Sequence, residues 1–273
     1  MRLRVATFNI HHGVGLDGRL DLGRTAEVIT ATGADLVGLQ EVDRTMSARS
    51  GWVDQAAWLG RRLGLQVLHG ATVDRPALPG SGPAAPRRRY GNALLTALPV
   101  RGWAARRLPG GGHEPRGVVD AVVAATGGDV RCAVTHLENR DGGARRAQAT
   151  HLAALLAGDG PGPVGPLPPP TILLGDLNAR PDSPELRVLT QTLVDAWTAV
   201  GRGDGPTFRS GRPAARIDYV LAGGPVRPVA VEVVATVASD HRPVVAELEL
   251  WPRVASAAPA SQRDDVDGGA GGR

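Results

Sequence analysis

Apolar residues recur along most of the chain in short runs, some alternating with polar residues and some continuous, and turn-forming residues separate the runs. Runs of this length and pattern predict β-strands. The predicted strands are Arg2 to Asn9, Asp35 to Glu41, Leu65 to Ala71, Ala93 to Ala97, Val100 to Leu108, Val118 to Ala125, Val130 to His136, Thr171 to Leu174, Arg216 to Ala222, Val226 to Val234 and Pro243 to Leu250. Helical spacing of apolar residues predicts helices at Leu22 to Thr32, Val53 to Leu63, Gly142 to Leu156 and Glu185 to Thr190.

The predicted elements fall into two similar halves, each with several strands and a few helices. Because an amphipathic helix or sheet must bury its apolar face against another element, we expect two sheets packed together with helices on their outer faces. The predicted fold is an α/β (α+β) protein, a four-layer αββα sandwich of two packed mixed β-sheets flanked by helices. We expect one domain over residues 1–252 and a disordered tail over residues 253–273, which lack any apolar period.

Two segments interrupt the pattern of elements. Thr72 to Tyr90 is rich in Pro, Gly and Arg and is predicted to be one long loop. Gly158 to Pro170 has the composition of a domain boundary, but a strand follows at once and neither flanking half has a complete sheet. We therefore interpret this second segment as a surface connection within one domain.

Composition excludes several classes of protein. Of the 273 residues, 42% are hydrophobic and 21% charged, which is ordinary for a globular chain, and the single cysteine, Cys132, excludes a disulfide framework. Every basic residue other than histidine is arginine, and the net charge of +4 permits an anionic substrate without indicating a nucleic-acid coat. No apolar run approaches the roughly 20 residues of a membrane span. We expect a cytoplasmic monomer.

Polar residues capable of chemistry stand at the ends of the predicted buried strands. Active-site groups often lie there, because a rigid sheet positions them and the loops shape a pocket. The candidates are Asn9, Glu41, His136, Asp176, Asn178, Asp218, Asp240 and His241.

The residue types at these strand ends favour a site for a hard cation and a phosphate. Asp176 and Asn178 are two positions apart and so point to one face of a strand, where both can reach one ligand or an attacking water. Asn9 and Glu41 add oxygen donors, which Mg²⁺ prefers, whereas zinc would require more His or Cys. His136 and a second histidine from another strand suit proton transfer or contact with a phosphoryl oxygen.

The same residues lie in motifs that resemble those of the endonuclease/exonuclease/phosphatase superfamily, which has the DNase I-like fold. The motifs occur in the family's order and extend from Arg4 to about Leu250. The matching segments are Thr7-Phe8-Asn9-Ile10, Leu39-Gln40-Glu41-Val42, Gly91-Asn92-Ala93-Leu94-Leu95-Thr96, Thr135-His136-Leu137, Gly175-Asp176-Leu177-Asn178, Arg216-Ile217-Asp218-Tyr219-Val220 and Ser239-Asp240-His241-Arg242-Pro243-Val244.

This resemblance implies cleavage of a phosphoester that depends on Mg²⁺ or Mn²⁺. It implies that Glu41 binds the metal with Asn9 beside it, and that Asp240 supports a metal as well. A bound cation neutralises developing charge and orients the phosphate.

The resemblance also implies roles for five other residues. His241 is the general base or the contact that orients the water and the phosphate, and Asp218 holds its ring. His136 stabilises the phosphoryl oxygens or protonates the leaving group. Asp176 and Asn178 position the nucleophile and the phosphate, and the sequence leaves open whether Asp176 is itself the base or a ligand of a second metal.

Four further predictions concern residues beside this site. Arg116 could bind a substrate phosphate or pair with Glu114, and Asn92 is a second candidate for substrate contact. His11 and His12 either line the pocket or lie in an exposed turn.

Two groups of charged residues are interpreted as structural rather than functional. The arginine run at Arg87 to Arg89 is interpreted as solvated. Asp35 and Asp43 are expected to face solvent.

The predicted function is hydrolysis of phosphoester bonds. The substrate class stays open among nucleic acid, a lipid head group, an inositol phosphate and a nucleotide. Because aromatic residues make up only 3% of the chain, stacking on bases is not indicated, and we favour a phosphodiesterase or phosphatase over a nuclease. A catalytically inactive binding or scaffold protein is the alternative of another class, and stabilisation by Mg²⁺ or Mn²⁺ would distinguish the two.

Overall fold

Two six-stranded sheets pack face to face in the computed structural model, which describes residues 1–110, 112–158 and 170–251. In spatial order the first sheet contains β11 (Val226–Val233), β12 (Val244–Leu250), β1 (Arg2–Asn9), β2 (Leu36–Arg44), β4 (Arg88–Thr96) and β3 (Gln66–Arg75). The second contains β5 (Val100–Arg107), β6 (Gly117–Ala125), β7 (Gly128–His136), β8 (Thr171–Asp176), β10 (Asp218–Gly223) and β9 (Val194–Asp195).

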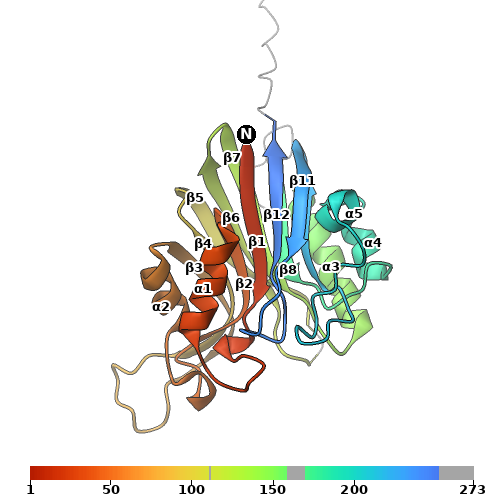
Figure 1. Cartoon of the computed structure of the whole chain (residues 1–273). Helices are drawn as coiled ribbons and strands as arrows, with labels where there is room; N and C mark the ends of the chain where they lie inside the picture. Colours follow the sequence, from red (N-terminus) through yellow and green to blue (C-terminus); the bar gives the residue numbers. More distant parts are fainter. Residues whose placement is uncertain (111, 159–169, 252–273) are drawn as a thin grey trace, which may run out of the picture.

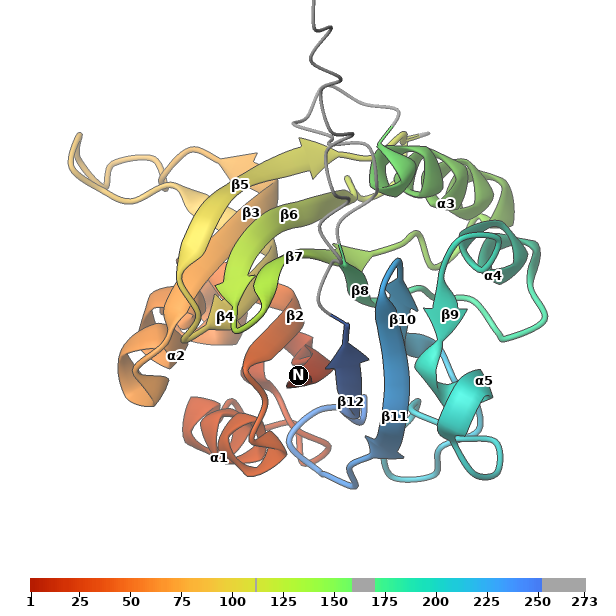
Figure 2. The ribbon, with the colours of Figure 1, turned by 90° about the horizontal axis from the view of Figure 1, so that it is seen from above.

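Helices cover the outer faces of both sheets (Figure 1, Figure 2). On the first sheet they are α1 (Leu22–Thr32) and α2 (Gln55–Leu63), and on the second α3 (Gly142–Ala157) and α4 (Pro184–Leu189). The short α5 (Ala196–Val200) lies beside β10 and β11, and two 3-10 turns, η1 (His11–Gly13) and η2 (Ala48–Ser50), follow β1 and β2. The predicted four-layer sandwich is therefore confirmed.

Neighbouring residues of one strand enter different layers of the core. In β1, Val5 packs between the two sheets while Ala6 packs under α1 and α2. In β8, Leu174 packs between the sheets while Leu173 packs against α3 and α4. Because successive side chains point to opposite faces, a strand covered on both faces is apolar throughout. This covering explains the unbroken apolar runs in the sequence.

Parallel pairing gathers the strand ends that carry polar residues. β1 pairs in parallel with β2, and β7 pairs in parallel with β8, so each sheet has two strands that end at the same edge. The loops that follow β1 and β2 lie at the end of the molecule opposite the N-terminus (Figure 1). The candidate site lies at these two edges.

The prediction of one long loop from Thr72 to Tyr90 is wrong at both ends. β3 and β4 continue into it, and only residues 76–87 connect them. Asp74 lies opposite Arg89 across the two strands, and Asp74 Oδ1 is 3.4 Å from Arg89 Nε. Oppositely charged cross-strand pairs stabilise a ladder, so a polar sequence extends as strand here.

Other predictions concern residues that the structure describes only in part. The predicted tail lies outside the described residues, as does nearly all of the segment Gly158 to Pro170. Within the described ranges no helix has the length and apolar character needed to cross a membrane. Cys132 is fully buried between the sheets.

Candidate active site

Strand register aligns three polar side chains at the end of the second sheet. Asp176 ends β8 and lies opposite His136 of parallel β7 and opposite Asp218 of antiparallel β10. All three residues are buried. Positions far apart in the sequence therefore meet through backbone pairing, as the sequence predicted for strand ends.

The first sheet brings His241 to the same place. β12 runs antiparallel to β1, so the turn before β12 lies beside the end of β1. Ser239 fixes this turn, because its hydroxyl donates to the Asn9 carbonyl at 2.7 Å and accepts from the His241 N–H at 3.2 Å. Phe208 packs against the His241 ring with the ring centroids 4.7 Å apart. His241 is thus held by backbone on one side and an aromatic ring on another.

Asp176, Asp218 and His241 form what we call the buried cluster. Nδ1 of His241 lies 2.9 Å from Oδ2 of Asp218, and Nε2 lies 3.6 Å from Oδ2 of Asp176. Thr207 restrains Asp218, because its hydroxyl accepts from the Asp218 N–H at 3.4 Å. The imidazole is therefore placed between two carboxylates, with Asp218 fixing its orientation.

Each member of the buried cluster changes the protonation of the others. Burial disfavours the charged His241, but the negative charges of Asp218 and Asp176 outweigh burial and raise the pKa of His241 to about 10. Burial and the charge of Asp218 raise the pKa of Asp176 to about 7, against the opposing charge of His241. The three groups therefore titrate as one unit.

Asn178 ties His136 to the buried cluster. Its backbone N–H donates to Asp176 Oδ1 at 2.9 Å, and its Nδ2 donates to the Leu137 carbonyl at 3.1 Å and lies 3.0 Å from His136 Nε2. His136 Nε2 is also 3.4 Å from Asp176 Oδ2. Burial and the charge of Arg116 lower the pKa of His136 to about 3, so its ring is neutral near neutral pH.

His11, His12 and Glu41 form the outer cluster, at the end of the first sheet. Their ligand atoms lie within 4.8 Å of one another, and Oε2 of Glu41 is 3.8 Å from Nδ1 of His12. All three have left-handed backbone, with φ of 45°, 42° and 59°. Such conformations cost about 1–3 kcal/mol each and cluster at functional sites. Here they turn three side chains toward one space.

Asn9 connects the two clusters. Its Nδ2 donates to Glu41 Oε1 at 3.2 Å and to Asp176 Oδ2 at 3.0 Å, and its Oδ1 accepts from the His11 N–H at 3.0 Å. Burial would raise the pKa of Glu41, but the side chain of His12 and the amide of Asn9 hold it well below its usual range. Glu41 is therefore a carboxylate at neutral pH.

The third predicted metal ligand, Asp240, lies on the other side of the histidine pair. Its Oδ1 is 3.8 Å from His11 Nδ1, and the rings of His11 and His12 are 4.5 Å apart. His12 Nδ1 is buried without a hydrogen-bond partner, an unfilled position that a cation beside Glu41 would fill. Carboxylate and carboxamide oxygens fit Mg²⁺ or Mn²⁺. The residues present therefore suit such a cation.

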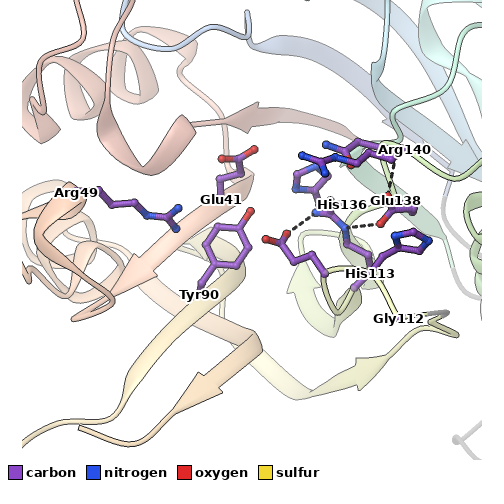
Figure 3. Close-up of a pocket in the computed structure, with 11 residues that line it drawn as sticks. Glu41, Arg49, Tyr90, Gly112, His113, His136, Glu138 and Arg140 are labelled. Carbon is purple, nitrogen blue, oxygen red and sulfur yellow. Dashed lines mark hydrogen bonds and ion pairs between the residues drawn. The ribbon is translucent and has the colours of Figure 1, made fainter. Parts of the chain in front are cut away.

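A polar pocket of about 440 Å³ opens beside Glu41 and His136 (Figure 3). Glu41 and His136 form the part of its wall that belongs to the site. Figure 3 shows Tyr90 and Arg49 on one side and Glu138 on the other. A substrate bound at the clusters can therefore extend into a preformed cavity.

The two predicted substrate contacts differ in position. Arg116 lines the polar pocket and also pairs with Glu114, with Nη1 of Arg116 3.1 Å from Oε1 of Glu114. The two alternatives for Arg116 are thus compatible. Asn92 is buried, and its Nδ2 donates to the Gly117 carbonyl at 2.9 Å, which ties β4 to β6. Asn92 holds the two sheets together next to Arg116.

The expectation that Asp43 faces solvent is wrong. Asp43 is fully buried, and its carboxylate accepts from Nε and Nη2 of Arg49 at 2.9 and 2.8 Å. The guanidinium lies over the Tyr90 ring, 5.4 Å from its centroid. A buried carboxylate requires such a partner. Asp35, by contrast, is exposed as predicted.

Sequence reasoning missed several residues that shape the site. Phe208 and Arg49 act through contacts between distant segments, for which no local pattern exists. Ser239 lies in the matched Ser239-Asp240-His241 motif, but its role in the turn was not predicted. Glu138 could have been found, because it lies two positions after His136 and in an extended segment would share its face. Tyr90 directly precedes the matched Gly91-Asn92 motif and offered a similar signal.

The comparisons with known proteins identify the family and the fold. The model of the Endonuclease/Exonuclease/phosphatase family matches residues 6–241. A crystal structure of an endonuclease/exonuclease/phosphatase from Beutenbergia cavernae DSM 12333 is 31% identical, with 91% of this chain and 72% of that chain covered and a TM-score of 0.75. No curated protein sequence matches the chain.

Two more distant structures share the fold. An endonuclease/exonuclease/phosphatase from Bacteroides vulgatus is 22% identical, with 92% of this chain and all (100%) of that chain covered and a TM-score of 0.73. A mannosyl-6-phosphatase from Bacteroides thetaiotaomicron VPI-5482 is 17% identical, with 91% and 100% covered and a TM-score of 0.71.

Proposed function

Because the chain belongs to the endonuclease/exonuclease/phosphatase family, whose members hydrolyse phosphoesters, we propose that it is a hydrolase of phosphoester bonds that depends on Mg²⁺ or Mn²⁺. The proposed catalytic unit is residues 1–252. One observation carries this proposal: His241 is fixed between Asp218 and Asp176 at 2.9 and 3.6 Å, beside the neutral His136.

The buried cluster handles the proton of the attacking water. Asp176 and His241 face one space from two different sheets, and between them they accept this proton and contact the phosphoryl oxygens, while Asp218 holds the imidazole ring. Water attacks phosphorus, the P–O bond to the leaving group breaks, and the leaving oxygen takes a proton. Asn178 and His136 lie where they contact the phosphoryl oxygens or the leaving oxygen.

The outer cluster and its neighbours hold the cation. Glu41, Asn9 and Asp240 would bind it, with the paired histidines beside them. When bound, the cation neutralises negative charge on the phosphate and orients it. The substrate is accordingly a phosphate ester, held between a cation site on the first sheet and proton-handling groups on the second.

Metal removal tests the proposal directly. We expect the protein to hydrolyse bis-p-nitrophenyl phosphate or p-nitrophenyl phosphate with Mg²⁺ or Mn²⁺ and to lose this activity in EDTA. A cation bound at 100 times its Kd stabilises the folded state by about 2.7 kcal/mol, so the melting temperature should also rise with metal. Full activity in EDTA would overturn the metal dependence. Metal-induced stabilisation without turnover of either ester would instead support the inactive binding protein.

A further inference from the structure

The polar pocket adjoins the reacting centre through Glu41 and His136, so a group esterified to a phosphate in the site would extend into it (Figure 3). Its other walls come from β4, from the turn before β6 and from the segment after β7. Its volume of about 440 Å³ lies within the range of small-molecule pockets, roughly 300–1,000 Å³.

The lining of the pocket is unusually polar for a small-molecule site. Such sites are mostly lined by apolar and aromatic side chains. Here the lining has one phenol ring, that of Tyr90, and the remaining side chains are charged or hydrogen-bonding, apart from Gly112. An aryl or aliphatic group would leave these polar groups without partners, which is costly. The occupant must therefore be polar over most of its surface.

Charge balance restricts the occupant further. The charged side chains of the lining are three carboxylates and three guanidiniums, those of Glu41, Glu114, Glu138, Arg49, Arg116 and Arg140. Asp43 lies behind Arg49 and offsets its charge as well. Negative and positive groups are therefore equal in number around the cavity. A polyanion would gain from the arginines but be repelled by Glu114 and Glu138, whereas an uncharged group meets no such penalty.

One hydrogen-bonding group of the lining has no partner. Arg116 is 5% exposed, and its Nε is buried without a hydrogen-bond partner, because the nearest carboxylate oxygen, Oε2 of Glu138, is 3.8 Å away. Oε1 of Glu138 already accepts from the Arg140 N–H at 2.8 Å. A hydroxyl both donates and accepts, so one hydroxyl can accept from Arg116 and donate to a carboxylate. A group with several hydroxyls could satisfy the arginine and both glutamates together.

We propose that the polar pocket binds an uncharged, hydroxyl-rich group, a sugar or polyol, which is esterified to the phosphate that the enzyme cleaves. This assignment rests on the proposed function and names its substrate class. Glu114, Arg116 and Glu138 are the specificity-determining residues.

Matched substrates test the assignment. With Mn²⁺ present, we expect kcat/KM for D-glucose 6-phosphate to exceed that for n-hexyl phosphate, an alkyl monoester with an apolar group and a similar leaving alcohol. Glucose 1,6-bisphosphate, which adds only a second charged group, should be the poorer of the two sugar esters. A preference for the hexyl ester or for the bisphosphate would overturn the proposal.

Carboxylate replacements assign the preference to this pocket. Glu114→Gln, whose side chain is 45% exposed and so not needed for folding, should lower the ratio of kcat/KM for glucose 6-phosphate to that for n-hexyl phosphate by about tenfold, the effect of one charged hydrogen bond. Glu138→Gln should lower it at least as much. Glu27→Gln, the same change on exposed α1, should leave the ratio unaltered. If the ratio of the two kcat/KM values were the same in all three variants, the pocket would not recognise the sugar.

A binding measurement separates this inference from the proposed function. Titration of the metal-loaded protein with glucose 6-phosphate, followed through the imidazole signals of His113 and His136, does not need turnover. If glucose 6-phosphate binds, Glu114→Gln weakens this binding and no ester is hydrolysed, the sugar pocket is supported and the proposed hydrolase activity is wrong. If aryl esters are hydrolysed but glucose 6-phosphate does not bind in this way, the hydrolase activity is supported and the sugar pocket is wrong.

Discussion

The buried cluster and the outer cluster lie side by side but are built differently. Asp176, Asp218 and His241 are each at most 5% exposed and come from, or directly precede, paired strands. The side chains of His11, His12 and Glu41 are 36%, 13% and 22% exposed, and their residues adopt left-handed backbone. The closest contact in the first is 2.9 Å, whereas the ion-pair distance from His12 to Glu41 in the second is 3.8 Å.

This difference indicates a division of labour. A hydrogen bond already joins His241 to Asp218, so the orientation of the imidazole is set before substrate arrives, as proton transfer requires. The outer cluster has open spacing and one buried nitrogen without a partner, on His12, so it is arranged to receive something from outside. Asn9 donates a hydrogen bond to each cluster and so fixes their relative position.

The strongest test of this division is to remove the buried imidazole. We expect His241→Ala to lower kcat by about 10²–10⁴-fold at saturating metal, the contribution of one positioned acid or base, and Asp176→Asn to be similarly impaired. The metal concentration for half-maximal rate should change little. The measurement is steady-state kinetics over a metal titration, with His151→Ala on the exposed side of α3 as the matched control. Full activity in His241→Ala would show that His241 does not have the catalytic role assigned to it.

A smaller and different effect is expected in the outer cluster. Glu41→Gln removes a charged oxygen ligand, so the metal concentration for half-maximal rate should rise at least about tenfold. Raising the concentration of Mn²⁺ should restore much of the rate. If the metal requirement stayed the same while kcat fell at every metal concentration, Glu41 would belong functionally with the buried cluster and the comparison would fail.

The sequence predicted the buried cluster better than its surroundings, for a physical reason. Its members end or precede strongly apolar strands, and strand pairing alone brings such ends together, so Asp176, Asp218 and His241 could be named without coordinates. The sandwich followed from the same pattern, because strands covered on both faces are continuously apolar.

The features that were missed depend on contacts that no local pattern records. Asp43 is buried because Arg49 folds back over it from η2. β4 begins at Arg88 because the polar residues there pair with residues of β3. The alternation of apolar and polar residues in the sequence cannot show such pairing. The polar pocket combines segments from both sheets, so of its lining the sequence indicated only Glu41, His136 and Arg116.

The subtlest test concerns charge inside the buried cluster. In metal-free protein, Asp218→Asn should lower the pKa of His241 from about 10, because the variant lacks the carboxylate that most favours the imidazolium. One close opposite charge is worth about 1–3 pKa units. NMR titration of the imidazole measures this, with exposed Asp35→Asn as the control. An unchanged pKa would mean that Asp176 alone holds the charge on His241.

The same shift predicts how stability depends on pH. A raised histidine pKa stabilises the folded state fully below the unfolded-state value of about 6.5, and this contribution disappears as pH rises through the folded-state value of about 10. In Asp218→Asn the loss should occur at lower pH, since the folded-state pKa is lower. The difference in unfolding free energy between the two proteins, measured in urea from about pH 7 upward, should therefore be largest near neutrality and shrink toward pH 10. A difference independent of pH would trace the effect of Asp218 to packing rather than to the charge of His241.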